Sequence, residues 1–115
     1  MGLSREDILN AQDRQPVVVS VPEWGGDVLV TTMTGADRDA FNLSLVGPDG
    51  ERNTKAISAR LVAFCTVDES GNRIFADEDI EALSLKSWQP IERLAQAIMT
   101  LNRLGDAELE DAEKN

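Results

Sequence analysis

The amino-acid sequence predicts an α+β fold in which an N-terminal β-hairpin packs on a small helical bundle. Two β-branched runs, 17–21 and 27–33, flank a Pro- and Gly-containing segment at 22–26, and this order is typical of a hairpin. The later periodic segments have helical spacing. The chain has 115 residues, of which 42% are apolar, enough for one core. We assign residues 1–105 to a single domain and 106–115 to an acidic tail, partly helical or disordered.

A short helix is expected before the hairpin, over residues 4–11. Ser4 can cap its N-terminus, and Asp7 occupies the reciprocal position of a capping box. The helix should end before Pro16, because the residue preceding a proline avoids the α region. In the second strand, Val28 and Val30 alternate with their neighbours, so we expect one face of the hairpin to be buried.

The next helix begins after Thr34, a residue type that favours the N-cap position. Asp37 lies in the first turn, where the helix dipole favours an acidic side chain. The spacing predicts a shared apolar face with two further apolar residues beside it. The expected face and its two neighbours are Ala36, Ala40 and Leu43, with Phe41 and Leu45.

Three more helices complete the predicted bundle. The first of these helices starts at Thr54, and a tight turn at 68–72 separates it from a short second helix, which Asp77 caps. The third and longest helix follows Ser87 and ends near Gly105. The first and longest of these helices each carry an apolar stripe. The stripes are Ile57, Leu61, Phe64 and Cys65, and Ile91, Leu94, Ala95, Ile98 and Leu101.

Charge and composition exclude several classes of function. The net charge is −10, from 11 basic and 21 acidic residues, which disfavours nucleic-acid and anionic membrane partners. The chain has no His and one Cys, Cys65, so it lacks the usual general base, the commonest metal ligand and any intrachain disulfide. No signal peptide or membrane span is evident. We therefore expect a cytoplasmic, non-catalytic protein with no cofactor and no metal.

The acidic segments do not match a known site. The segment 68–79 has acids at its ends, but Arg73 stands where a calcium-binding EF-hand loop needs Gly, so a turn and helix cap are favoured. Among the two tryptophans, we expect Trp88 to cap the core. For Trp24, at the hairpin turn, a core position and a partner-anchoring position are equally favoured.

Three stretches of the chain together resemble a known family. These stretches, 21–41, 59–87 and 91–115, resemble phage tail assembly chaperones of long-tailed phages or prophages. The resemblance implies a protein that binds the tape-measure protein, keeps it soluble and helps tail-tube subunits assemble around it. It also implies action in the cytoplasm of the bacterial host, absence from the mature virion, and no catalytic residues.

Such chaperones are often made in a second, longer form by a programmed frameshift. Glu113, Lys114 and Asn115 can be encoded by an A-rich run suited to ribosomal slippage. These residue types also end many soluble proteins as ordinary surface residues, so both interpretations stay open.

The expected mechanism is helix-in-groove recognition, in which an acidic domain offers an apolar groove to an amphipathic helix. The expected contact residues are Trp24, Phe41, Met99 and Leu104, which we expect to be exposed at the edges of the predicted stripes. A homo-oligomer is compatible with this interpretation. The alternatives are an acidic nucleic-acid mimic or other small phage regulatory binding protein, supported by the charge of −10, and, more weakly, a small enzyme that uses Asp, Glu, Lys, Arg or Ser.

Overall fold

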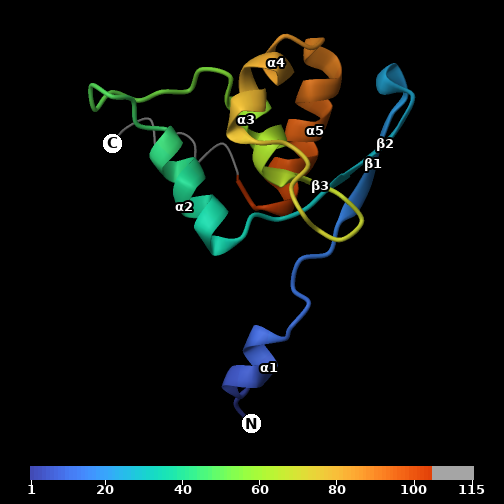
Figure 1. The fold of residues 1–115 in the computed structure, drawn as a ribbon, viewed down its shortest axis with the longest axis vertical. Helices are drawn as coiled ribbons and strands as arrows, with labels where there is room; N and C mark the ends of the chain where they lie inside the picture. Colours follow the sequence, from blue (N-terminus) through green and yellow to red (C-terminus); the bar gives the residue numbers. More distant parts are fainter. Residues whose placement is uncertain (105–115) are drawn as a thin grey trace.

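The computed structural model describes residues 1–104 and has an α+β fold (Figure 1). The predictions for Gly105, the 106–115 tail and the last three residues therefore lie outside the described part of the chain. The elements are α1 (Arg5–Leu9), β1 (Val17–Val21), the 3₁₀ turn η1 (Pro22–Trp24), β2 (Gly26–Val30), α2 (Gly35–Ser44), α3 (Ile57–Cys65), β3 (Thr66–Val67), the 3₁₀ turn η2 (Asp77–Asp79), α4 (Ile80–Ser84) and α5 (Trp88–Leu101).

The predicted hairpin is confirmed, and it belongs to an antiparallel sheet with the strand order β1-β2-β3. In the pairing of β1 with β2, Val17 lies opposite Val30 at one end and Val21 lies opposite Gly26 at the other. Gly25 ends the turn between them with a φ of 80°, a conformation that favours glycine. The third strand was not predicted, because its two residues carry no periodic signal and form a strand only through their pairing with β2.

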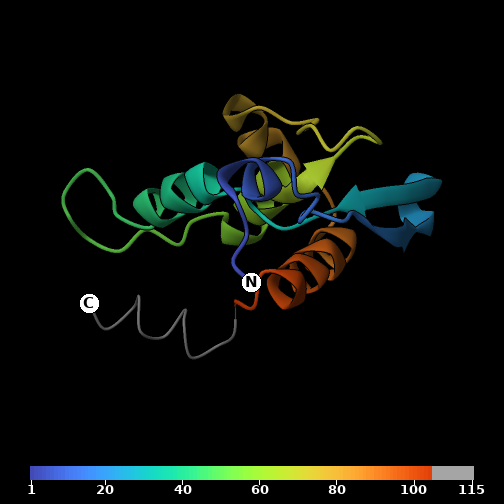
Figure 2. The same ribbon diagram turned by 90° about the horizontal axis from the view of Figure 1, so that it is seen from below.

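The two faces of the hairpin have different surroundings. Val21 and Val30 are fully buried, and Val19 and Val28 pack against the core beside them. Because side chains alternate along a strand, Val18 lies on the opposite face. Figure 2 shows α5 on one side of the hairpin and the turn after β3 on the other. The sheet therefore covers the helices with one face and leaves the other open.

α3 lies at the centre of the core, and every residue from Ala59 to Cys65 is buried. It packs against α5, whose Leu94 and Ile98 are fully buried as the apolar stripe predicted. On another side, Phe64 of α3 meets Phe41 of α2 edge to face, with ring centroids 6.1 Å apart, a favourable aromatic geometry.

Two helix N-caps were predicted correctly. The Ser4 hydroxyl accepts a hydrogen bond from the Asp7 amide, and the Asp7 carboxylate accepts one from the Ser4 amide. Thr34 likewise accepts from the Asp37 amide. Ser87, in contrast, occupies the N-cap position of α5 without a side-chain capping bond.

Two predictions about burial were wrong. Leu43 is 74% exposed, and the buried face of α2 is instead formed by Phe41 and Leu45, which are four residues apart and so share one face. Trp88 does not cap the core but is 71% exposed. It is the first residue of α5, and the buried stripe starts only at the following Pro90 and Ile91.

Candidate partner-binding surface

A groove lies on the open side of the sheet, next to the turn that follows β3. Its volume is about 540 Å³. It is built from β2, β3 and the segment 68–74, so residues far apart in the sequence contribute to one surface. The lining residues are Asp27, Val28, Leu29, Thr66, Val67, Asp68, Glu69, Ser70 and Ile74.

The floor of the groove is apolar. Leu29 is paired with Val67 on one side and with Val18 on the other, so these three side chains form a row across the sheet. Val67 is buried, Leu29 is half-buried and Val18 is 60% exposed. Ile74, which is 53% exposed, lies beside this row in the groove wall. A partner could therefore bury apolar surface here without disturbing the core.

The rim of the groove is acidic, and part of it is held by hydrogen bonds. Asp27, Asp68 and Glu69 are exposed and line the groove. The Asp68 carboxylate accepts hydrogen bonds from the amides of Ser70 and Asn72, at 2.9 and 3.0 Å, in the manner of an Asx turn. These bonds fix the shape of the turn, so Asp68 both stabilises the turn and contributes negative charge to the rim.

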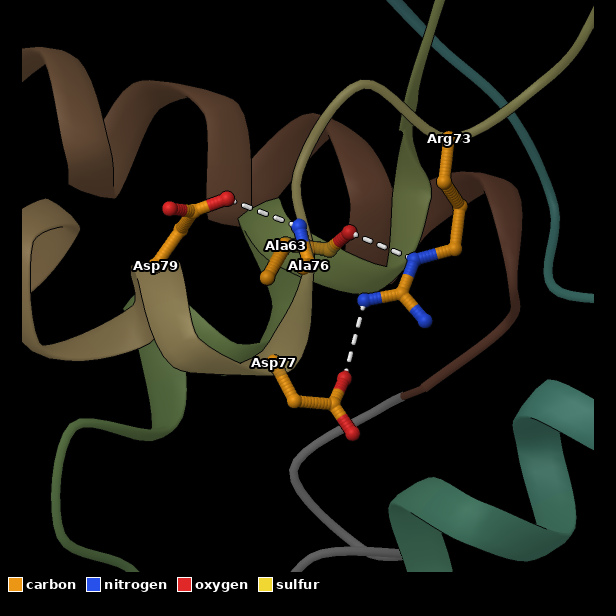
Figure 3. A network of polar contacts seen from close by, with 5 residues as sticks. All are labelled: Ala63, Arg73, Ala76, Asp77 and Asp79. Atoms are coloured by element: carbon orange, nitrogen blue, oxygen red, sulfur yellow. Dashed lines mark hydrogen bonds and ion pairs between the residues drawn. The ribbon is translucent and has the colours of Figure 1, made fainter.

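Arg73 fixes the segment that carries Ile74 (Figure 3). Its Nε donates to the carbonyl of Ala63 at 3.0 Å, and its Nη2 donates to Asp77 at 3.1 Å. Its guanidinium lies over the Phe64 ring, 4.6 Å from the centroid, within the range of a cation–π contact. Because Arg73 is held by α3 and by Asp77, the adjacent Ile74 has a defined position in the groove.

A second hollow continues from Ile74 onto α4. It has a volume of about 340 Å³ and is lined by Ile74, Phe75, Asp79, Ala82, Leu83 and Lys86. The Asp79 carboxylate accepts from the Ala76 amide at 2.8 Å, which fixes the start of η2 (Figure 3). Ile74 thus joins two hollows, and the apolar surface extends from the sheet toward α4.

The four contact residues expected from the sequence do not line these hollows. Trp24 is 39% exposed at the hairpin turn, and Met99 is partly buried against the core. The expectation that Phe41 and Leu104 are exposed was wrong, because only 1% and 5% of their surfaces are accessible. Phe41 is enclosed by its contact with Phe64, and the Leu104 amide donates to the Met99 carbonyl, which turns the chain back onto the core.

Sequence reasoning overlooked Leu29 and Ile74. The signal for Leu29 was its place between the buried-face residues Val28 and Val30, since alternation puts it on the other face. Ile74 had no comparable signal, because its position depends on the contacts of Arg73.

Two features describe the reactive side chains of residues 1–104. In residues 1–104, no cluster of three or more His, Cys, Asp or Glu side chains could hold a metal ion. Burial raises the pKa of the Cys65 thiol to about 12, so the reactive thiolate is disfavoured at neutral pH. None of the described helices is long and apolar enough to cross a membrane.

Comparison with known proteins gives an informative likeness to a solved structure. No protein-family model matches the sequence, and no curated protein is significantly similar to it. The structure is similar to that of the bacteriophage HK97 tail assembly chaperone, with a TM-score of 0.60 and 16% sequence identity. The likeness covers 84% of this chain and 94% of the other. The chain thus has the fold of a bacteriophage tail assembly chaperone.

Proposed function

We propose that this protein is a non-catalytic tail assembly chaperone, which binds the tape-measure protein and helps recruit tail-tube subunits during phage tail morphogenesis. The observation that carries the proposal is the likeness of fold to the HK97 tail assembly chaperone, over 84% of the chain. The protein would act in the cytoplasm of the bacterial host and be absent from the finished virion.

The groove supports a specific mode of binding. Its floor of Leu29 and Val67, with Ile74 in the wall, suits the apolar stripe of an amphipathic helix, and its acidic rim suits Lys or Arg beside that stripe. The apolar contacts would supply most of the affinity, because exposed ion pairs contribute only ~0–1 kcal/mol each. The net charge of −10 would keep the complex dispersed.

Co-expression with the tape-measure protein of the same phage tests the proposal. The soluble fraction of the tape-measure protein should rise when the wild-type chain is present. Ile74→Asp should abolish this gain, because it places a charge in the apolar wall of the groove. Leu43→Asp is the matched control, since Leu43 is 74% exposed on α2 and does not line the groove.

The outcomes separate the function from the site. If the wild-type chain leaves the solubility of the tape-measure protein unchanged, the chaperone function is wrong. If Ile74→Asp and Leu43→Asp both behave like wild type, only the groove is wrong. Binding in 0.5 M salt should persist for an apolar groove, whereas a nucleic-acid mimic would lose its basic partner under the same condition.

A further inference from the structure

β1 is an edge strand that lacks the usual protection against pairing. In the strand order β1-β2-β3, β1 has a neighbour on one side only among the described residues. Its sequence, VVVSV, contains no charged residue, and its register with β2 is continuous, without a bulge. Protected edges usually carry a Lys, an internal Pro or a bulge. The hairpin also extends beyond α5 in both views (Figures 1 and 2), and Val17, Val18 and Ser20 of β1 are exposed.

The sequence around this edge is nearly palindromic. Residues 16–22 read PVVVSVP, with Val19 at the centre. When two copies are aligned antiparallel about Val19, Val17 faces Val21, Val18 faces Ser20, and Pro16 faces Pro22. Because Pro cannot donate a ladder hydrogen bond, the two prolines limit the pairing to the five residues between them.

We propose that two copies of this chain pair through their β1 edges, antiparallel and with a two-fold axis at Val19. The two three-stranded sheets would then form one continuous sheet, held by backbone hydrogen bonds as in β-strand addition.

Charge favours a second copy at this edge. Each chain carries a net charge of −10, so two copies can approach closely only where acidic side chains are absent. Residues 15–22 are all uncharged. The next residue, Glu23, is paired with Arg93 of the same chain. The edge is therefore a self-complementary surface on which repulsion between copies is smallest.

The pairing has a geometric consequence for the groove. A two-fold axis perpendicular to the sheet keeps the open faces of both copies on the same side. The two grooves would then face one extended partner together, which raises the effective concentration of the second contact. This consequence alone rests on the proposed function; the pairing itself does not.

Disulfide trapping tests both the pairing and its register. Val18 is 60% exposed and Ser20 is exposed, so Val18→Cys and Ser20→Cys should fold normally, which thermal melting checks. Directly opposed residues have Cα atoms ~4.5–5.5 Å apart, within reach of a disulfide, whereas diagonal neighbours at ~7–8 Å are too distant. The natural Cys65 is fully buried and should not interfere.

Air oxidation of an equimolar mixture of the two variants should give a disulfide-linked heterodimer, identified by mass spectrometry. Each variant alone should give at least several-fold less dimer. Sedimentation velocity of the wild-type chain should show a dimer that dissociates on dilution.

Equal cross-linking in the mixture and in the single variants would overturn the register. A monomer at every concentration, with no cross-linking, would overturn the pairing. Since no tape-measure protein is present, neither result bears on the chaperone function.

Discussion

Arg93 of α5 donates two hydrogen bonds to the carboxylate of Glu23, with N–O distances of 2.7 and 2.6 Å. This bidentate pair joins the longest helix to the turn of the hairpin, across 70 positions of sequence. The fork of the guanidinium matches the two carboxylate oxygens, which makes the contact directional as well as charged.

The Glu23–Arg93 pair should make stability depend on pH. The hydrogen bonds from Arg93 lower the pKa of Glu23 from 4.5 to about 2. A carboxyl whose pKa is lower in the folded state stabilises the fold above the unfolded-state value, and this contribution disappears as pH falls through the folded-state value. Glu23→Gln should therefore melt below wild type at pH 7, and the difference should shrink between pH 4.5 and 2.

The matched control for this prediction is Glu81→Gln, which removes an equal charge from an exposed position on α4. Thermal melting of the three proteins across this pH range is the measurement. A difference between Glu23→Gln and wild type that stays constant from pH 7 to pH 2 would contradict the prediction.

Leu94 and Ile98 should contribute strongly to the stability of the core. Both are fully buried where α5 packs on α3. Truncation of either residue to Ala should lower the free energy of unfolding by about 2–5 kcal/mol, through lost burial and a residual cavity. The exposed Leu85 is the control, and Leu85→Ala should change stability by no more than about 0.5 kcal/mol. Urea unfolding measures all three, and an equal effect at all sites would contradict the packing.

Arg60 should be essential to the connection between α2 and α3. Its guanidinium is buried and donates to the carbonyls of Ser44, Asn53 and Lys55. Arg60→Ala should lower stability by about 1–3 kcal/mol, because three partly buried hydrogen bonds lose their donor. Arg60→Lys should not restore stability, since one ammonium group cannot reproduce the planar fork.

Limited trypsin digestion gives a second readout for Arg60. Cleavage after Lys55 should become faster in both Arg60 variants, because the carbonyl of Lys55 loses its contact with Arg60. Lys86→Ala, an exposed change on the turn after α4, should leave cleavage after Lys55 at the wild-type rate. Unchanged cleavage in the Arg60 variants would show that other contacts fix this connection.

The Cys65 thiol should be unreactive in the folded protein. It is fully buried, and burial raises its pKa to about 12, while Asn102 Nδ2 lies 3.8 Å from its sulfur. A thiol reagent such as DTNB should give no rapid reaction at pH 7.5 and one equivalent in guanidinium chloride. Rapid reaction of the native protein would show that α3 opens readily.

Local signals in the sequence predicted much of the fold. The β-branched runs, the Thr34 cap and the stripe of α5 depend on neighbours within a few positions, and each was confirmed. Tertiary contacts decided the rest. β3 exists only as a partner of β2, and the side of α2 that is buried depends on where Phe64 lies.

The candidate site was harder to predict than the fold for the same reason. An acidic protein could be expected from composition, and an apolar groove from the resemblance to tail assembly chaperones, but the groove is assembled from segments about 40 residues apart, near Leu29 and Val67. Phe41 and Leu104 looked like exposed edges of their stripes. A one-dimensional pattern identifies apolar residues, but it does not show which of them a neighbouring element covers.

Asn102 has a consequence for the order of folding. Its Oδ1 accepts from the Met33 amide at 2.8 Å, so the end of α5 is bonded to the segment after β2 across 69 positions. The contacts within the hairpin, and those between α3 and α5, span shorter stretches of sequence than this bond, which needs the closure of a longer loop. We expect docking of the hairpin onto α5 to be a late step in folding. Until it occurs, the valines of the inner sheet face are exposed, and nascent chains are most prone to aggregate in that interval.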